Sequence, residues 1–384
     1  MVRPRYWLAL AAAALAAAQG PLKREGAGWA QDSGGSVATT AVKLKVVSPG
    51  PITVRGGGES IRYSIKRRAR AGSEAEARQV LDAFQVKTRT SGDWLVLWVE
   101  APARGAGTPE LALSVPRGLK ECVIEARGGR IEAFDLDGGV EAHTTAGGIT
   151  IDRVAGPVKA HTGGGEVRLG WIGGAVRCIS GGGSVHLERA GGEALIETAG
   201  GEIVVGEAGG QVRASTAGNI HVRRAAGSVT AHAAGGLIEV QHSGGAVIAE
   251  TSGGSIQVGG ARGARLESAA GAIRLRGVTG ALRASTALGN ILADLQAGVA
   301  GDSFLGTVRG DITVYIPSNL AVTVRARSEA GSRGRIVSEF PEIRLQPDPG
   351  DMLRPVAAEG ALNGGGPLLT VAAGQGSVFL RRQK

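Results

Sequence analysis

The sequence contains few aromatic residues, few cysteines and no apolar run long enough to cross a membrane. Aromatic residues make up 3% of its 384 residues, and its cysteines are Cys122 and Cys178. An exported protein could oxidise two cysteines. These two fall several repeat units apart, however, so we expect no disulfide and take Cys178 to be a small buried hydrophobic residue. The scarcity of aromatic residues also gives no support to nucleic-acid binding, because single strands are held largely by stacking on aromatic side chains.

The N-terminus has the pattern of a secretory signal peptide. A basic start that ends at Arg5 is followed by a short, alanine-rich apolar stretch from Tyr6 to Ala18. This stretch is too short for a membrane-spanning helix, which needs about 20 residues. We expect a signal peptide over residues 1–18, cleaved after Ala18 or as late as Ala30, with an uncleaved anchor as the alternative. No cysteine follows the run, which excludes a lipoprotein anchor, so the mature chain is expected to be exported without a transmembrane span.

Glycine is abundant, with 65 residues, and it recurs at a fixed interval. So much glycine would indicate a flexible or fibrous chain if apolar residues were scarce, but 43% of the chain is hydrophobic, which predicts a packed core. Because glycine can adopt a positive φ without a Cβ clash, we expect each Gly-Gly pair to let the chain reverse tightly. The second glycines of the pairs follow steps of nine residues, with one eight-residue step before Gly218 and a slip that leaves Arg262 in the slot: Gly165, Gly174, Gly183, Gly192, Gly201, Gly210, Gly218, Gly227, Gly236, Gly245, Gly254, Gly271, Gly280 and Gly289.

The nine-residue units alternate between two kinds, so the full period is 18 residues. In one kind the second and fourth residues after the glycine are both large and apolar, whereas in the other kind the fourth residue is small. Apolar residues two apart and bounded by glycine indicate short strands with one inward face. The sequence therefore predicts an all-β fold, a parallel β-solenoid (β-helix) of two-strand coils, with about ten coils from near Gly129 to near Gly298 and a length of roughly 48 Å. In one strand, Ala194 and Ile196 exchange the large and small positions and keep their total volume, as packing requires.

Hydroxyl residues form a second regular row, two residues beyond the small position. We expect them to stack at a corner of the coils and to hydrogen-bond with one another along the ladder. The alternative is a flat polar face of the ice-binding kind, which usually needs two outward threonines per strand, and the intervening residues here do not provide them. The row comprises Thr144, Thr162, Ser180, Thr198, Thr216, Thr251, Ser268 and Thr286, with Ala233 as the exception.

The flanks of the repeat lack the strict glycine period. Residues 19–35 are expected to be a polar leader, and residues 36–120 an N-terminal β-rich cap with one short helix over residues 73–84, which begins with a serine N-cap. The solenoid repeats are expected over 121–301, and residues 302–384 are expected to continue the β structure and to cap its other end. A solenoid needs such caps because its last strands would otherwise present open edges.

The order of several motifs resembles the large bacterial family of unknown function that is called putative adhesin. The resemblance implies an exported β-solenoid fold, and it transfers no catalytic or binding residues. It covers nearly the whole mature chain, and its strength lies in the order of the motifs. The motifs are Glu74-Ala-Glu-Ala-Arg, Leu113-Ser-Val-Pro-Arg-Gly, Gly129-Arg-Ile-Glu-Ala-Phe followed by residues up to Thr144, Gly310-Asp-Ile-Thr-Val-Tyr-Ile-Pro, and Leu362-Asn-Gly-Gly-Gly-Pro.

The nine-residue period invites comparison with calcium-binding nonapeptides, in which an aspartate lies four residues after the second glycine. This sequence places Leu, Val or Ala there, so a calcium-binding repeat is rejected. Neighbouring coils carry His143 and His161 in the same slot, where they are expected to stack, but no acidic residue or cysteine completes a tetrahedral metal set. We expect exposed histidines without a ligand. The six histidines are His143, His161, His186, His221, His232 and His242.

Two fragments imitate hydrolase signatures, Gly301-Asp-Ser303-Phe and Asp32-Ser33-Gly-Gly. No histidine follows the first, and the second lies in the polar leader, so neither supports a catalytic triad. The sequence therefore predicts no catalytic residues, no cofactor-binding residues, no metal ligands and no cofactor.

The chain carries a formal net charge of +9, and the excess lies in the flanks. Between Gly129 and Gly298 there are 14 Lys and Arg against 15 Asp and Glu, a charge of −1 that leaves +10 for the rest. The densest basic run extends from Arg62 to Arg70. Such a run can bind anionic polymers or lipid head groups, but it more often forms a solvated strand face, and we favour that interpretation.

These observations lead to a non-enzymatic, exported β-solenoid that serves as a cell-surface or periplasmic interaction scaffold of the adhesin-like kind. Its partner is expected to be an unknown envelope or extracellular ligand, a protein or a glycan, rather than a nucleic acid, and its location periplasmic, cell-surface or secreted. The alternative is a polysaccharide-binding or polysaccharide-degrading β-helix. Against it, the repeat offers few aromatic residues for sugar stacking, Phe134 and Trp171, and no outward carboxylates are expected to cluster in adjacent coils.

Overall fold

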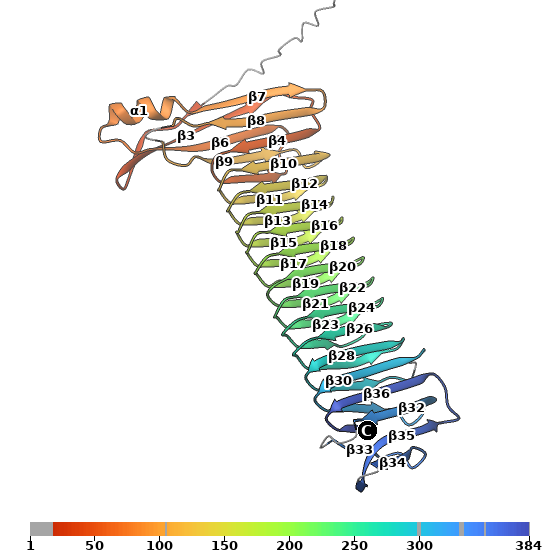
Figure 1. Ribbon diagram of the computed structural model, residues 1–384. Coiled ribbons are helices and arrows are strands. Elements are labelled where there is room, and N and C mark those ends of the chain that lie inside the picture. Colours follow the sequence, from red (N-terminus) through yellow and green to blue (C-terminus); the bar gives the residue numbers. More distant parts are fainter. Residues whose placement is uncertain (1–17, 104–105, 298–300, 330–333, 349–350, 384) are drawn as a thin grey trace, which may run out of the picture. The chain divides into compact units, whose positions relative to one another are not determined.

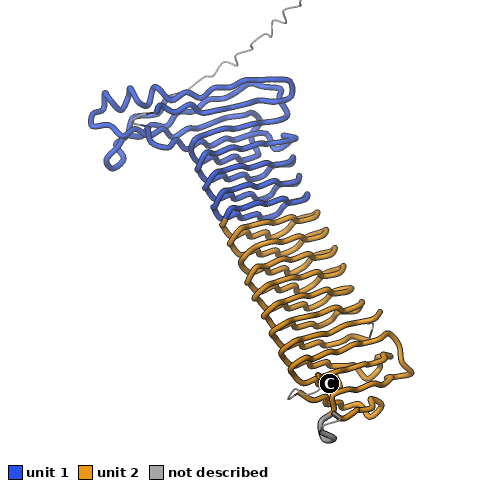
Figure 2. The backbone as a smooth tube through the Cα atoms, viewed as in Figure 1, with its two compact units in different colours: residues 1–181 blue, residues 182–384 orange. Residues whose placement is uncertain are grey.

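The structure is a computed structural model that describes residues 18–383, apart from 104–105, 298–300, 330–333 and 349–350. The predicted signal peptide, residues 1–18, thus lies outside the described residues except for Ala18. The protein is nearly all β (61% strand and 3% helix), with a parallel β-solenoid of about 11 turns and, in the described part, a single helix (Figure 1). The predicted fold class is confirmed. The chain forms two compact units, residues 1–181 and 182–384 (Figure 2), and each is described by itself.

Unit 1 contains two parallel sheets, each built from one kind of strand. Strands of one coil pair with the equivalent strands of the next coil, so that Val140 lies beside Val158 and Ala142 beside Ala160. Equivalent positions therefore stack, and the inward rows are apolar and buried. One sheet contains β10 (Glu121–Ala126), β12 (Gly139–Thr144), β14 (Val158–Thr162) and β16 (Val176–Ser180), and the other contains β11 (Ile131–Leu136), β13 (Ile149–Val154) and β15 (Val167–Ile172).

The N-terminal part of unit 1 continues the same two sheets in an altered order. Strands β4 (Lys43–Ser48) and β5 (Ile52–Gly56) pair in parallel with β10 and β11 on one side. On the other side they pair, also in parallel, with β8 (Trp94–Glu100) and β9 (Glu110–Val115), which come later in the chain. The coil formed by β4 and β5 therefore lies between two pairs of strands that come later in the chain, and neither edge of β4 or β5 is open.

Strands also occupy the segment that was expected to be a polar leader. Residues 19–35 contribute to β1 (Ala18–Gln19), β2 (Lys23–Glu25) and β3 (Gly28–Val37). β3 pairs antiparallel with β6 (Ile61–Ala69) from Trp29 to Val37. Burial of Ala30 and Val37 explains the difference, because the segment has its own apolar contacts despite its polar composition.

One helix, α1 (Glu74–Asp82), connects β6 to β7 (Gln85–Ser91), which pairs antiparallel with β8. The Glu76 N–H donates to the hydroxyl of Ser73, the N-cap residue, over 3.3 Å. Ala77 and Leu81 form its buried side. Its C-terminus receives a hydrogen bond of 2.9 Å from the buried guanidinium of Arg67 to the Leu81 carbonyl, which fits the preference for a positive charge at that end of a helix.

Unit 2 has the same two-sheet organisation. One sheet contains β17 (Val185–Ala190), β19 (Ile203–Ala208), β21 (Ile220–Ala225), β23 (Ile238–Ser243), β25 (Ile256–Val258), β27 (Ile273–Val278), β29 (Ile291–Leu295) and β31 (Ile312–Ile316). The other contains β18 (Ala194–Thr198), β20 (Val212–Thr216), β22 (Val229–Ala233), β24 (Val247–Thr251), β26 (Ala264–Ser268), β28 (Leu282–Leu288) and β30 (Ser303–Arg309). Ala194 stacks on Val212 and Ile196 on Ala214, so the exchanged sizes noted in the sequence are accommodated within two inward rows.

The C-terminal part of unit 2 also reverses the order of its last coils. The final strands β36 (Leu368–Gln375) and β37 (Val378–Arg382) pair in parallel with β30 and β31. Their other edges pair with the earlier strands β32 (Val322–Ser328) and β33 (Ile336–Ser338). Beyond β32, an antiparallel hairpin of β34 (Arg344–Asp348) and β35 (Asp351–Leu362) extends the sheet. The last strands of the chain are thus inserted between two coils instead of forming an exposed end.

The repeated glycines are required by close approach of neighbouring coils and not by positive φ. The expectation about φ was wrong, since the described glycines with positive φ lie outside these slots. A Cβ on Gly165 would lie 2.2 Å from the carbonyl oxygen of Gly147, and one on Gly236 would lie 2.1 Å from that of Gly218. The other glycine of a pair is less constrained, because a Cβ on Gly164 would meet nothing within 4 Å.

The row of hydroxyl residues is buried and binds the glycine turns. Thr162 donates to the carbonyl of Gly147 over 2.8 Å and accepts the N–H of Gly165 over 3.2 Å. Each hydroxyl therefore joins the turn of its own coil to the turn of the preceding coil, in place of the expected hydroxyl-to-hydroxyl contacts. Burial also excludes this row as an exposed ice-binding face. Both bonds recur at Thr144, Thr216, Thr251 and Ser268.

Candidate functional site

The outer faces of β11, β13 and β15 carry a cluster of aromatic and charged side chains in three consecutive coils of unit 1. In each of these strands, as in β17, β19, β21 and β23 of unit 2, two successive residues face outward before the chain returns to a buried residue. Asp135 and Arg153, two of these outward residues, have φ values of +61° and +54°. Left-handed backbone is uncommon in residues other than glycine and costs of order 1 kcal/mol or more. We name the outward residues Phe134, Asp135, Asp152, Arg153 and Trp171 the Trp171 patch.

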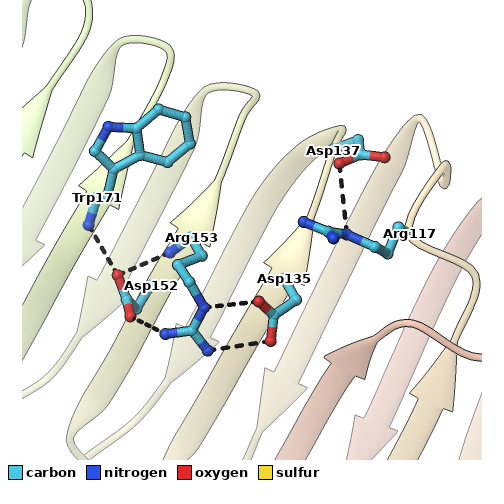
Figure 3. A network of polar contacts seen from close by, with 6 residues as sticks. All are labelled: Arg117, Asp135, Asp137, Asp152, Arg153 and Trp171. Carbon is cyan, nitrogen blue, oxygen red and sulfur yellow. Dashed lines mark hydrogen bonds and ion pairs between the residues drawn. The ribbon is translucent and has the colours of Figure 1, made fainter.

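Arg153 lies at the centre of this patch, between two carboxylates (Figure 3). Its Nε donates to Asp135 Oδ1 over 2.7 Å and one Nη to Oδ2 over 3.1 Å, a bidentate arrangement. The other Nη donates to Asp152 Oδ2 over 2.5 Å. Bidentate guanidinium–carboxylate pairs fix orientation as well as charge, so this contact ties neighbouring coils together on the surface.

The second carboxylate oxygen of Asp152 binds the backbone of Trp171. Its Oδ1 accepts the Trp171 N–H over 2.9 Å. Gly170 makes this contact feasible, because a Cβ there would lie 2.2 Å from Asp152 Oδ1. The Trp171 side chain is 47% exposed and is drawn outside the ion network in Figure 3. A tryptophan whose backbone is fixed by a hydrogen bond and whose ring is exposed to solvent is typical of a recognition surface.

Guanidinium groups surround the second aromatic ring of the patch. The Arg55 Cζ lies 4.8 Å and the Arg153 Cζ 5.8 Å from the centroid of the Phe134 ring, within the range of cation–π attraction. Beside them, Arg117 and Asp137 approach to 3.9 Å. Phe134 therefore contributes mainly to holding the arginines, and Trp171 is the aromatic residue that remains available to a ligand.

The carboxylates of the patch are suited to recognition more than to proton transfer. The hydrogen bond from Arg153 lowers the pKa of Asp135 below its usual value, and the same contact raises the pKa of Arg153. A glycosidase needs one carboxylic acid with a raised pKa to protonate the leaving group. The expectation that no outward carboxylates would cluster in adjacent coils was wrong, since Asp135 and Asp152 both bind Arg153. Arg153, which favours the ionised form of Asp135, argues against a glycosidase pair.

Sequence reasoning identified the aromatic residues of this patch but missed its ionic residues. Asp135, Arg153 and Trp171 are 18 residues apart, which is the full repeat, so the period itself placed them in one outward row. The sequence could not show that Arg153 adopts left-handed backbone or that its guanidinium turns back to the preceding coil.

The histidines lie on the outer faces, and several contact glutamates. The rings of His143 and His161 are neighbours as predicted, with centroids 5.9 Å apart, but they are tilted by 37° and not stacked face to face. His143 lies 2.7 Å from Glu141, and His232 lies 3.3 Å from Glu250. His221 contacts both Glu202 and Glu239, at 3.2 and 3.1 Å. No group of three metal-ligating side chains occurs among residues 18–383 outside the gaps in the described chain.

The fragments that imitate hydrolase signatures have structural roles. The Ser303 hydroxyl is buried, donates to the Gly301 carbonyl over 3.3 Å and accepts the Leu282 N–H over 3.1 Å. Asp32 and Ser33 lie within β3. The cysteines are free and buried, and burial raises the pKa of each thiol to about 12, so neither Cys122 nor Cys178 has the thiolate character of a nucleophile.

The basic run from Arg62 to Arg70 is largely neutralised or buried. Lys66 pairs with Glu25 at 2.6 Å, and Arg68 pairs with Glu110 at 2.6 Å. Arg67 points inward with 4% of its surface exposed, and its other Nη donates to Gln31 over 2.9 Å. The solvated strand face favoured from the sequence thus holds for exposed residues such as Arg62 and Arg70 but not for the buried Arg67, and part of the run's charge is already paired.

Comparison with known proteins confirms the predicted resemblance to the bacterial putative adhesin family of unknown function. Residues 195–335 match the family described as Toastrack DUF4097. This segment lies within unit 2 and contains the motif from Gly310 to Pro317, whereas the other motifs of the resemblance lie outside it. No curated protein matches the sequence.

Solved structures similar to the chain include a putative cell adhesion protein from Clostridium sporogenes ATCC 15579, with 9% identity and a TM-score of 0.22, over 92% of this chain and 100% of that one. Another is a putative adhesin from Bacteroides fragilis NCTC 9343, with 8% identity and a TM-score of 0.19, over 96% and 97%. No helix of the described residues is long and apolar enough to span a membrane.

Proposed function

We propose that this protein is a non-enzymatic, exported scaffold of the adhesin-like kind, which binds an envelope or extracellular ligand through the Trp171 patch. The observation that carries the proposal is the half-exposed Trp171 beside a network that fixes its backbone. Tryptophan and arginine are the residues most enriched at binding hot spots. Two residues with left-handed backbone support the same view, because such conformations persist where the surrounding structure holds them and often mark functional sites.

The repeat supports a role as a scaffold. Hydrogen bonds between the hydroxyl row and the glycine turns connect successive coils within each unit, as at Thr162 in unit 1 and Thr216 in unit 2. A surface built on such connected coils loses little conformational entropy when it binds, and this favours affinity. The outward residues can therefore vary for recognition while the inward rows keep the fold.

Binding through the patch can be tested with the Trp171→Ala variant. Labelled protein is applied to a defined glycan array and to purified peptidoglycan and lipopolysaccharide. We expect a probe that binds the native protein and loses at least tenfold in affinity with Trp171→Ala. Trp94→Ala is the matched control, because Trp94 is a half-buried tryptophan on the other sheet of unit 1, where it contacts Lys43. Equal losses in both variants would contradict the proposed site.

A polysaccharide-degrading activity is the alternative function. It would release new reducing ends or unsaturated ends from a panel of polysaccharides. We expect no such release, because both patch carboxylates are paired with Arg153 and this contact lowers the pKa of Asp135. Turnover that is abolished by Asp135→Asn would replace the scaffold proposal with an enzymatic one.

We further propose export by a signal peptide that is cleaved after Ala18. Cleavage as late as Ala30 would remove the first residues of β3, whose pairing with β6 begins at Trp29. N-terminal sequencing of the exported protein distinguishes the two sites. Protease treatment of intact cells then separates the cell-surface form, which is digested, from a periplasmic form, which is protected.

A further inference from the structure

The outer face of unit 2 carries a groove where the glycine period breaks. Arg262 occupies a slot that holds glycine in the other coils, and the next residue, Gly263, has a φ of +142°. The strand that follows, β26, still has five residues like β24, but the next two strands of the sheet, β28 and β30, have seven. The departure from the repeat coincides with a change in the shape of the surface.

Two hollows meet at Phe304 on this face. One, of about 480 Å³, is bounded by Ile248, Arg262, Arg283 and Phe304. The other, of about 640 Å³, is bounded by Phe304, Val308, Arg327 and Val356. We name the pair of hollows the Phe304 groove. It crosses several strands of one sheet, so it follows the direction in which the coils of unit 2 stack.

Small residues form the floor of the groove between two rows of larger side chains. The strand register places Ser285 beside Gly306, Gly306 beside Ala372, and Ala372 beside Arg327. The Phe304 ring leans over Gly306, where a Cβ would lie 2.7 Å from the ring. The glycine thus lets a partly exposed aromatic ring lie along the floor, where a flat ligand can contact it.

Most of the charge around the groove that has no ion pair is positive. Arg262, Arg283 and Arg327 are exposed, and no ion pair involves them within the described residues. Arg283 instead approaches the Phe304 ring, with its Cζ 5.6 Å from the centroid.

The acidic residues of the groove already have partners. Asp302 Oδ1 accepts the Leu368 N–H over 2.9 Å. Glu267, which lines neither hollow, pairs at 2.9 Å with Arg265, which lines the first one. Glu329 also has a polar partner. A ligand in the groove therefore meets guanidinium groups that lack a counter-charge, and these prefer carboxylates or related anions.

We propose that the Phe304 groove binds a linear acidic glycan, in which a sugar ring stacks on Phe304 and sugar carboxylates pair with Arg283 and Arg327. An aromatic ring with neighbouring hydrogen-bond donors suits a pyranose face, and guanidinium groups suit its carboxylates. A peptide is less suited, because the floor strands are paired on both edges and offer no free edge for strand addition. Nucleic acid would need further aromatic residues for stacking. This site is in unit 2, and its binding does not depend on the Trp171 patch in unit 1.

The test uses oligogalacturonate of eight residues, titrated calorimetrically into the purified protein. We expect saturable binding that weakens at least tenfold in the Arg283→Ala/Arg327→Ala double variant. The matched control is Arg213→Ala/Arg274→Ala, which removes the same charge from two exposed arginines of unit 2 that form no ion pair with the residues the structure describes. It should change the affinity less than twofold. Phe304→Leu should weaken binding several-fold, and Trp171→Ala should leave it unchanged.

The inference would be overturned by absence of binding to the native protein, by equal losses in the groove and control variants, by equal affinity for neutral cellohexaose, or by equal affinity for polyglutamate of the same charge. The polyglutamate result would indicate an acidic peptide or nonspecific anion binding. Circular dichroism of each variant establishes that loss of binding does not reflect loss of fold. Loss of oligogalacturonate binding in Trp171→Ala alone would assign the glycan to the patch and refute the groove.

Discussion

Substitution of Gly165 by alanine tests the physical reason for the glycine repeat. The new Cβ would lie 2.2 Å from Gly147 O and 2.5 Å from Gly148 N, so the two coils must move apart by more than 1 Å to reach ordinary contact distances. Overpacking of this kind typically costs about 1–3 kcal/mol. Separation also weakens the two hydrogen bonds of Thr162 to these turns, each worth about 1 kcal/mol. We expect a loss of about 3 kcal/mol in the free energy of unfolding.

The adjacent glycine of the same pair provides the control. A Cβ on Gly164 would meet nothing within 4 Å, so Gly164→Ala should be neutral or should stabilise by about 0.5 kcal/mol through the unfolded chain. Thermal unfolding is followed by tryptophan fluorescence, because every described tryptophan lies in unit 1. For a unit of this size, Gly165→Ala should melt roughly 6–12 °C below the native protein. Equal melting temperatures for the two variants would refute close approach as the cause.

Two further predictions concern the hydroxyl row and the ion network. Thr216→Val keeps the shape of the side chain but leaves the carbonyl of Gly201 and the N–H of Gly218 without their hydroxyl partner, so we expect chemical denaturation to show a loss of about 1–3 kcal/mol. The pKa of Asp135 is lowered from its model-compound value of 3.8 by the Arg153 contact, so the network should be intact above pH 3.8 and be lost as the pH falls through the lower folded value. Fluorescence titration against a Trp171→Phe reference measures this, and a transition well above pH 4 would contradict it.

The two proposed sites assign different chemistry to the two units. The Trp171 patch is a fixed, mixed-charge surface in which each carboxylate already has a guanidinium partner. The Phe304 groove is a hollow with unpaired guanidinium groups. The first should therefore depend little on salt, whereas the second should weaken as salt screens its exposed charges. Each site can be lost by substitution without loss of the other.

Periodicity was sufficient to predict the solenoid, because inward positions stack on their equivalents one coil later. The alternation that predicted β17 to β28 returns in the structure as buried rows, such as Ile203 beside Ile220. Periodicity was insufficient at the ends. The insertion of β4 and β5 between later strands, and of β36 and β37 between earlier ones, depends on pairings between segments that no fixed spacing connects.

The candidate sites show the same division. The spacing of Asp135, Arg153 and Trp171 is a property of the sequence, and so is the replacement of glycine by Arg262. The contacts that bring Asp135, Arg153 and Trp171 together depend on left-handed backbone and on the absence of a side chain at Gly170. The Phe304 groove depends on Ala372, which comes from a strand that follows β30 by about 60 residues in the chain yet lies beside it.

The sequence by itself determined the fold class, the 18-residue coil, the inward rows and the resemblance to putative adhesins, because all of these follow from local spacing and from side-chain size. Only the tertiary structure showed that close approach of coils requires the glycines and that the hydroxyl row donates hydrogen bonds to glycine carbonyls. It alone also showed how the two ends are closed and which outward residues contact one another. Those features depend on distances between neighbouring coils. A separation of about 4.8 Å between strands leaves room for a glycine but not for a Cβ directed at the adjacent backbone.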